Sequence, residues 1–277
     1  MIVPMWLLLL LPIAGFLVGI VASMTGVGGG IFIVPLLTVL FSFIPQHAVG
    51  TSLTCIVFTA LAATYSYARQ GRIFYRTGLL LAITSVPGAY LGAYLTSLVS
   101  PSLLGLIFGI FLFVISLRMI YQKRKNSSER VVPGVESPEP GEPISAPQRS
   151  DAELMKSPWT LSLAVGLSLF AGMSSGFLGI GGGVLGVPIM TLVLGMPIHF
   201  STATSMFTMV FTSLSGVVKH TLAHHVHLGH ALLLALGTVF GAQVGAHFSK
   251  RVSARNLRRV FGAVLLLVSI QMILKFL

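Results

Sequence analysis

Long apolar runs separated by short polar stretches make up most of the chain. Six of these runs approach or exceed the ~20 residues that a helix needs to cross a bilayer. They cover roughly residues 48–68, 77–98, 102–121, 201–219, 231–249 and 257–275. Two further apolar segments, 5–42 and 158–196, are each interrupted by glycines. The pattern predicts an all-α polytopic membrane protein with about eight to ten membrane helices.

The two interrupted segments contain matching glycine breaks. Gly26-Val27-Gly28-Gly29-Gly30 and Gly179-Ile180-Gly181-Gly182-Gly183 are each followed five residues later by a proline, Pro35 or Pro188. Each glycine of such a triplet costs a helix roughly 1 kcal/mol relative to alanine. Within a membrane, non-helical backbone is tolerated only where protein covers it or where it lines a cavity. Matching breaks in the two halves of a chain therefore indicate a transporter's substrate site.

The second half of the chain repeats the first at a constant offset of 153 residues. At this offset Trp6 matches Trp159, and Thr51-Ser52 matches Thr204-Ser205. The constant register predicts an N-terminal membrane repeat, 1–121, and a C-terminal membrane repeat, 158–277. Residues 122–157 are rich in Pro, Glu and Ser and too poor in apolar residues to fold, so we expect a flexible cytoplasmic linker.

The basic residues predict that the two repeats are inverted relative to each other. They follow the first and third spans of the first repeat, but the second span of the second repeat. With inverted repeats, 15 of the 17 Lys and Arg residues lie in the cytoplasm, against 12 with parallel repeats. Inversion requires each glycine-broken segment to form a hairpin of two short helices, which is followed by three transmembrane helices. Both termini are then expected outside the cytoplasm.

Composition and charge narrow the class of protein. The chain has 277 residues, of which 55% are hydrophobic and only 8% charged, too few charges for the surface of a soluble protein. We expect a multi-pass protein of the cell inner membrane or plasma membrane. All six acidic residues lie between residues 129 and 153, outside the apolar segments. Cation and proton transporters usually carry an intramembrane acid, so the sequence favours an anionic or neutral substrate.

The glycine breaks and the two Thr-Ser pairs form the candidate substrate site. A helix that restarts after each glycine triplet presents N–H groups without internal partners and the positive end of its dipole. Glycine lets an anion approach this backbone closely, and the Thr-Ser pairs add hydroxyl donors or N-caps. The alternatives are that the glycines only permit close helix packing and that the hydroxyls bond within their own helices. The predicted substrate-binding residues are Gly28, Gly29, Gly30, Thr51, Ser52, Gly181, Gly182, Gly183, Thr204 and Ser205.

These motifs resemble those of the TauE/SafE family. The chain has G-V-G-G-G-I-F-I-V-P at 26–35 and G-I-G-G-G-V-L-G-V-P at 179–188, each followed by A/S-x-x-T-S, at 48–52 and 201–205. The resemblance covers both halves and fails only over the linker. It implies a duplicated multi-span exporter of sulfite, sulfoacetate or other organosulfonates, without identifying the anion.

The expected mechanism is secondary export by alternating access, in which one repeat rocks against the other. An anion that leaves a cell with an inside-negative potential gains about 2.3 kcal/mol per 100 mV, so no fuel, coupling acid or cofactor is required. A gated anion channel is the alternative. The expected partners are a small anionic substrate, membrane lipid and, since many transporters form them, a homodimer. We expect no nucleic acid, because the positive-inside rule explains the basic loops.

Two further motifs suggest other chemistry. His220, His224, His225, His227 and His230 lie within eleven residues, so metal binding, pH sensing and a plain solvated loop are all open; we predict no metal site. Residues 172–176 match G-x-S-x-G, the pattern of a hydrolase nucleophile elbow. An elbow needs a strand before it and an acid to orient a histidine, and this stretch offers neither. We therefore expect a transporter and not an intramembrane serine hydrolase.

Overall fold

Helices make up nearly all of the chain that the structure describes. The computed structural model describes residues 5–121, 158–249 and 254–277, and these ranges contain helices and no strand. The elements are α1 (Met5–Thr25), α2 (Gly30–Pro35), η1 (Leu36–Leu40), α3 (Pro45–Arg69), α4 (Tyr75–Leu98), α5 (Pro101–Tyr121), α7 (Pro158–Leu178), α8 (Gly183–Pro188), η2 (Ile189–Val193), α9 (Ile198–Leu222), α10 (Leu228–Phe248) and α11 (Ala254–Phe276). The all-α prediction is confirmed, and the six predicted spans match helices to within a few residues. The predicted linker lies outside the described residues.

The glycine breaks fall where the sequence predicts them. The first break begins where α1 ends. Gly26 adopts φ 73° there, and the N–H groups of Gly26 and Val27 both donate to Ala22 O, at 2.9 and 3.2 Å. Gly28 and Gly29 also have positive φ, 88° and 86°, which L side chains rarely adopt. The second break repeats this conformation, with Gly179, Gly181 and Gly182 at positive φ.

The two arms of each broken segment differ in length. α1 and α7 each have 21 residues, so the prediction of two short helices is wrong for the first arm. No glycine pair or triplet interrupts the apolar run of that arm before the break. The second arms are short, because Pro35 and Pro188 each end a six-residue α-helix. Each proline is followed by five residues of wider π-helix, η1 or η2, where proline's missing N–H and its bulk are easier to accommodate.

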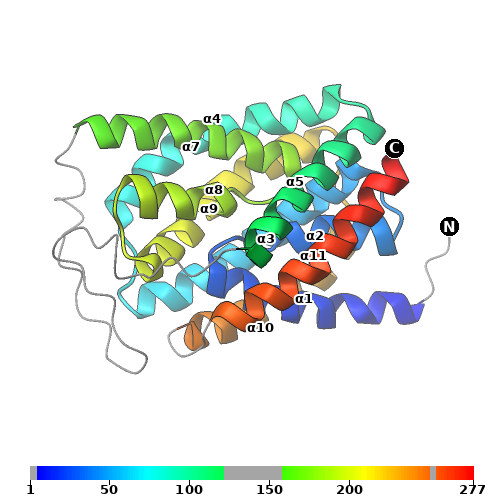
Figure 1. The fold of residues 1–277 in the computed structure, drawn as a ribbon, viewed down its shortest axis with the longest axis horizontal. Coiled ribbons are helices and arrows are strands. Elements are labelled where there is room, and N and C mark those ends of the chain that lie inside the picture. The colour runs from blue at the N-terminus through cyan, green and yellow to red at the C-terminus, as the bar shows by residue number, and fades with distance from the viewer. Residues whose placement is uncertain (1–4, 122–157, 250–253) are drawn as a thin grey trace.

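Helices from the two halves alternate in space. Contacts between neighbours give the order α7–α4–α9–α3–α10–α1, while α5 packs against α11 and α3 (Figure 1). At the 153-residue offset α1 corresponds to α7 and α4 to α10, so the contacts α4–α7 and α1–α10 are equivalent. The first helix of each half therefore packs against the other half.

Glycines set the closeness of these equivalent contacts. Gly172 and Gly176 of α7 face α4, where an added Cβ would lie 2.1 Å from Ser85 O and 2.0 Å from Ala89 O. Ser174 between them lies inside the continuous helix α7, so residues 172–176 have no strand-to-turn geometry. The G-x-S-x-G match is a small-residue helix-packing motif of the kind common in membranes.

We expect Gly172→Ala to weaken the packing of α7 on α4 and to lower the free energy of unfolding by about 1–3 kcal/mol, the usual cost of overpacking. Gly166→Ala is the matched control, because it lies in the same helix and an added Cβ there would have no atom within 4 Å. Thermal unfolding of the purified variants in detergent measures both effects. Equal midpoints for the two variants would contradict the direct α4–α7 contact.

Candidate functional site

The two glycine breaks contact each other directly. An added Cβ on Gly30 would lie 2.1 Å from Gly179 O, and one on Gly183 would lie 2.1 Å from Gly26 O. Since 30 and 183, and 26 and 179, are equivalent positions, this is one contact made twice. A side chain at Gly30 or Gly183 would collide with the backbone of the opposite break, so the close approach requires glycine.

The Thr-Ser pairs tie each break to the other half of the chain. Ser52 Oγ donates to Gly179 O at 2.9 Å, and Ser205 Oγ donates to Gly26 O at 3.1 Å. Both carbonyls lie just beyond the end of a helix, where backbone acceptors lack intrahelical partners. The serine of each pair therefore supplies a hydrogen bond to a backbone carbonyl of the other half.

The threonines of the two pairs accept hydrogen bonds from loops of the other half. His227 N–H donates to Thr51 Oγ1 and Phe74 N–H donates to Thr204 Oγ1, both at 3.1 Å. Positions 74 and 227 are again equivalent, so this contact is also made twice. Both threonines are fully buried.

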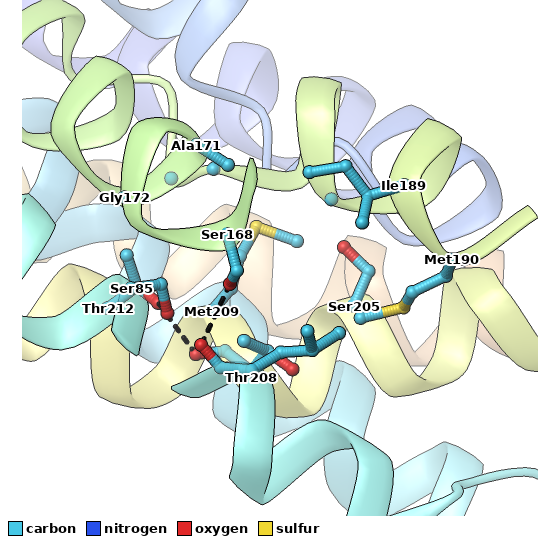
Figure 2. A pocket seen from close by; sticks show the side chains of 14 residues that line it. Ser85, Ser168, Ala171, Gly172, Ile189, Met190, Ser205, Thr208, Met209 and Thr212 are labelled. Carbon is cyan, nitrogen blue, oxygen red and sulfur yellow. Dashed lines mark hydrogen bonds between the residues drawn. The ribbon is translucent and has the colours of Figure 1, made fainter. Parts of the chain in front are cut away.

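A small cavity of about 20 Å³, room for about one water molecule, lies beside the second break (Figure 2). Hydroxyl groups are its main polar feature, and no Lys, Arg, Asp or Glu lines it. In Figure 2 the hydroxyls of Ser85 and Thr212 lie on one side of the cavity, and Ile189 and Met190 lie on the other. The lining residues are Leu81, Ser85, Ser168, Ala171, Gly172, Gly181, Gly182, Gly186, Ile189, Met190, Ser205, Thr208, Met209 and Thr212.

The cavity hydroxyls bond to acceptors within the protein. Ser85 Oγ lies 2.9 Å from Thr212 Oγ1, Ser168 Oγ donates to Leu81 O at 2.8 Å, and Thr208 Oγ1 donates to Thr204 O at 3.0 Å. A hydroxyl rotates about its C–O bond and can turn its proton toward a ligand. The arrangement thus supplies neutral donors to a small oxyanion. Each hydroxyl that donates to the anion gives up its hydrogen bond to an acceptor within the protein.

The equivalent region of the first half is more apolar at several positions, although the pair Ser85–Thr212 has an equivalent in Thr238–Thr59, whose hydroxyls lie 2.8 Å apart. Thr208 and Gly186 correspond to Cys55 and Ile33, which are fully buried in the hydrophobic core. Ser175, a buried hydroxyl without a hydrogen-bond partner, corresponds to Ala22. The polar cavity therefore lies on the second half's side of the crossing.

Three of the ten predicted substrate-binding residues, Gly181, Gly182 and Ser205, line the cavity. The other seven are buried at the crossing or in the contacts around it: Gly28, Gly29, Gly30, Thr51, Ser52, Gly183 and Thr204. Sequence reasoning missed the lining hydroxyls Ser85, Ser168, Thr208 and Thr212. A comparison of the two copies for positions that are polar in only one of them would have found Ser168 and Thr208, which match Gly15 and Cys55.

The histidine cluster joins the two halves at one end of the molecule. His47, from the first half, has its Nδ1 2.9 Å from His227 Nε2, and His225 Nδ1 lies 3.4 Å from His220 Nδ1. His220 is fully buried, so the expectation of a plain solvated loop is wrong for this residue. In the described part of the chain, no three His, Cys, Asp or Glu side chains are placed to hold a metal ion.

Comparisons with known proteins agree on one class. The model of the family described as "Sulfite exporter TauE/SafE" matches residues 11–272. The "Probable membrane transporter protein YunE" of Bacillus subtilis is 33% identical over 271 residues, which cover 95% of this chain and 96% of that protein. A "Probable membrane transporter protein" of Methanocaldococcus jannaschii is 26% identical and covers 96% of this chain and 97% of its own length. No solved structure matches the chain.

We expect Ser52→Ala to lower the free energy of unfolding by about 1–3 kcal/mol, because it leaves the buried Gly179 carbonyl without a partner. Ser97→Ala is the control, since Ser97 Oγ makes only a 3.5 Å contact to Ala93 O in its own helix. Chemical unfolding in detergent measures the difference. A cost for Ser52→Ala no larger than that for Ser97→Ala would show that the hydroxyl does not hold the break.

We also expect the protein to lose stability as the pH falls below about 6.5. Burial lowers the pKa of His225, in the loop between α9 and α10, below its ordinary value of 6.5, and the charges of His47, Lys219 and His224 lower it further. The unfolded chain then binds protons that the folded state resists, so stability is complete above this pH and falls below it. Melting temperatures at pH 7.5 and 5.5 should differ less in His225→Gln than in the native protein; an equal difference would contradict this role.

Proposed function

The chain belongs to the TauE/SafE sulfite exporter family, and we propose that it exports small sulfur-containing anions such as sulfite, sulfoacetate or other organosulfonates. As a member it is a membrane transporter and not an enzyme, and it is a multi-pass protein of the plasma membrane. The observation that carries the proposal is the hydroxyl-lined cavity beside the glycine crossing.

The lining suits an oxyanion because every polar side chain in it is a neutral hydroxyl. In the proposed mechanism the cavity, which has room for about one water molecule here, widens as the halves move and admits the anion. The backbone of the second break also borders the cavity, because Gly181 and Gly182 line it. Because no carboxylate lines the cavity, the lining does not repel an anion. The absence of lining cations keeps binding weak enough for release, which transport requires as much as capture.

The proposed architecture is a pair of inverted repeats that exchange roles during alternating access. The twofold contacts between equivalent positions support it. Support also comes from α3 and α9, which are equivalent helices: Gly50 lies beside His220, and Leu53 lies beside Gly216. Residue numbers in contact therefore rise along α3 as they fall along α9. The two helices run antiparallel, as equivalent helices of inverted repeats would.

The proposed energetics need no coupling ion. An anion that leaves through an inside-negative potential is driven by about 2.3 kcal/mol per charge per 100 mV. No Asp or Glu lies in the described membrane helices to bind a co-transported cation, since all six are at 129–153. A channel would use the same driving force, and saturable counterflow separates a carrier from it.

The test is efflux from proteoliposomes loaded separately with sulfite, sulfoacetate, taurine, sulfate or acetate. We expect saturable efflux of sulfite or a sulfonate, faster when the loaded side is made negative, and slow efflux of acetate. Transport of none of the sulfur compounds would refute the substrate class, and efflux insensitive to the imposed potential would refute uncoupled export.

Gly186→Ala tests the cavity itself. An added Cβ there would enter the cavity and meet only Ser205 Oγ, at 3.4 Å, so we expect an unchanged melting temperature. We expect efflux about tenfold lower at subsaturating substrate, equivalent to about 1.4 kcal/mol of lost binding. Gly166→Ala, at a position that does not line the cavity and where an added Cβ meets no atom within 4 Å, should transport normally. Normal efflux by Gly186→Ala would exclude this cavity as the binding site.

A further inference from the structure

The exposed face of α10 carries a polar pocket near its C-terminal end. The pocket lies between α3 and α10, has a volume of about 310 Å³, and contains a guanidinium, an imidazole, two amides and two hydroxyls but no carboxylate. Its lining residues are Tyr65, Ser66, Arg69, Gln70, Gln243 and His247. These groups suit an oxyanion such as a phosphate.

An apolar groove begins one helical turn away on the same face of α10. It lies between α1 and α10 and is lined by Pro12, Ile13, Phe16, Leu236, Gly237 and Phe240. Leu236, Phe240, Gln243 and His247 are spaced four, three and four residues apart, which places them on one face of the helix. All four are exposed, so one exposed face of α10 leads from the polar pocket to the apolar groove, and we call this face with the two sets of lining residues the strip.

The length of this strip matches one leaflet of a bilayer. Eleven residues separate Leu236 from His247, about 16 Å of helix at 1.5 Å per residue. Half of the hydrocarbon core of a bilayer is about 15 Å thick. With His247 at headgroup depth, Leu236 therefore lies near the middle of the membrane.

The polar end of the strip lies on the basic side of the membrane domain. Arg69 and Tyr65 lie at the C-terminal end of α3, where the guanidinium is 5.7 Å from the tyrosine ring centre. Behind them the buried Arg72 donates to Gln70 Oε1 at 3.1 Å. Such residues mark the cytoplasmic interface by the positive-inside rule and the aromatic belt, and that leaflet carries the anionic lipids.

We propose that this strip, defined by the two sets of lining residues, is a binding site for one anionic phospholipid of the cytoplasmic leaflet. Arg69 binds the phosphate, with Gln243, Ser66 and His247 as further hydrogen-bonding groups, and an acyl chain follows Phe240 and Leu236 toward the mid-membrane. A small soluble anion would use the polar pocket but not the apolar groove. The site shares no residue with the cavity at the glycine crossing.

Binding is measured by native mass spectrometry and thermal stabilisation of the purified protein with phosphatidylglycerol, phosphatidylcholine or glycerol 3-phosphate. We expect retention and stabilisation by phosphatidylglycerol above the other two. Arg69→Gln should weaken phosphatidylglycerol binding about fivefold, the effect of one basic residue near an anionic surface. Arg76→Gln, the control, removes the same charge at the same end but outside the strip and should bind normally. Phe240→Ala, at a side chain 63% exposed, should keep the fold and weaken binding of the lipid.

Three results would overturn the proposal. Equal binding of the two phospholipids would show that the headgroup charge is not recognised. Equal losses in Arg69→Gln and Arg76→Gln would mean general surface attraction and no site. Stabilisation by glycerol 3-phosphate as strong as by the lipid would assign the pocket to soluble anions.

Discussion

The fold depends on how the protein satisfies non-helical backbone in the interior of a membrane domain. Each glycine break leaves carbonyl groups without helical partners, in a solvent that offers no hydrogen bonds. Ser52 and Ser205 answer this need by donating to Gly179 O and Gly26 O across the crossing. Because each serine comes from the opposite half of the chain, neither break is fully satisfied by its own half. The same backbone that a transporter needs at its centre thus holds its two halves together.

The helix packing extends this mutual dependence to the edges of the molecule. α1 packs against α10 and α7 against α4, so each half covers the small-residue face of the other. Where Gly172 approaches Ser85 O and Gly241 approaches Phe16 O, an added Cβ would come within 2.1 Å of a carbonyl. In lipid such interfaces are stabilised by close van der Waals contact and not by hydrophobic burial. Even one added methyl group would therefore disturb the packing. The halves are therefore two interlocked parts of one packed body.

Periodicity and glycine chemistry were enough to predict the helices, their approximate ends and the breaks, because a glycine triplet stops a helix whatever surrounds it. The long first arm of each hairpin was not predicted. The site was predicted only in part: Gly181, Gly182 and Ser205 line the cavity, whereas Thr51 and Ser52 serve contacts between the halves. A hydroxyl residue in an apolar helix looks the same in sequence whether its side chain faces a cavity or a backbone carbonyl. Only the tertiary structure shows which of the two it contacts. His47 joins the histidine cluster across 180 residues of sequence, a contact that local spacing does not encode.

The unequal polarity on the two sides of the crossing has an energetic consequence. Were the copies identical in sequence, exchanging the roles of the halves would give two conformations of the same free energy. Thr208 stands opposite Cys55, and Gly186 opposite Ile33, so the lining is more polar and less filled by side chains in one copy than in the other. If the halves exchanged conformations, the hydroxyl groups would enter a different environment. The two conformations would therefore differ in free energy. Under the proposed alternating access, this difference between the two copies would give the transporter a preferred resting conformation.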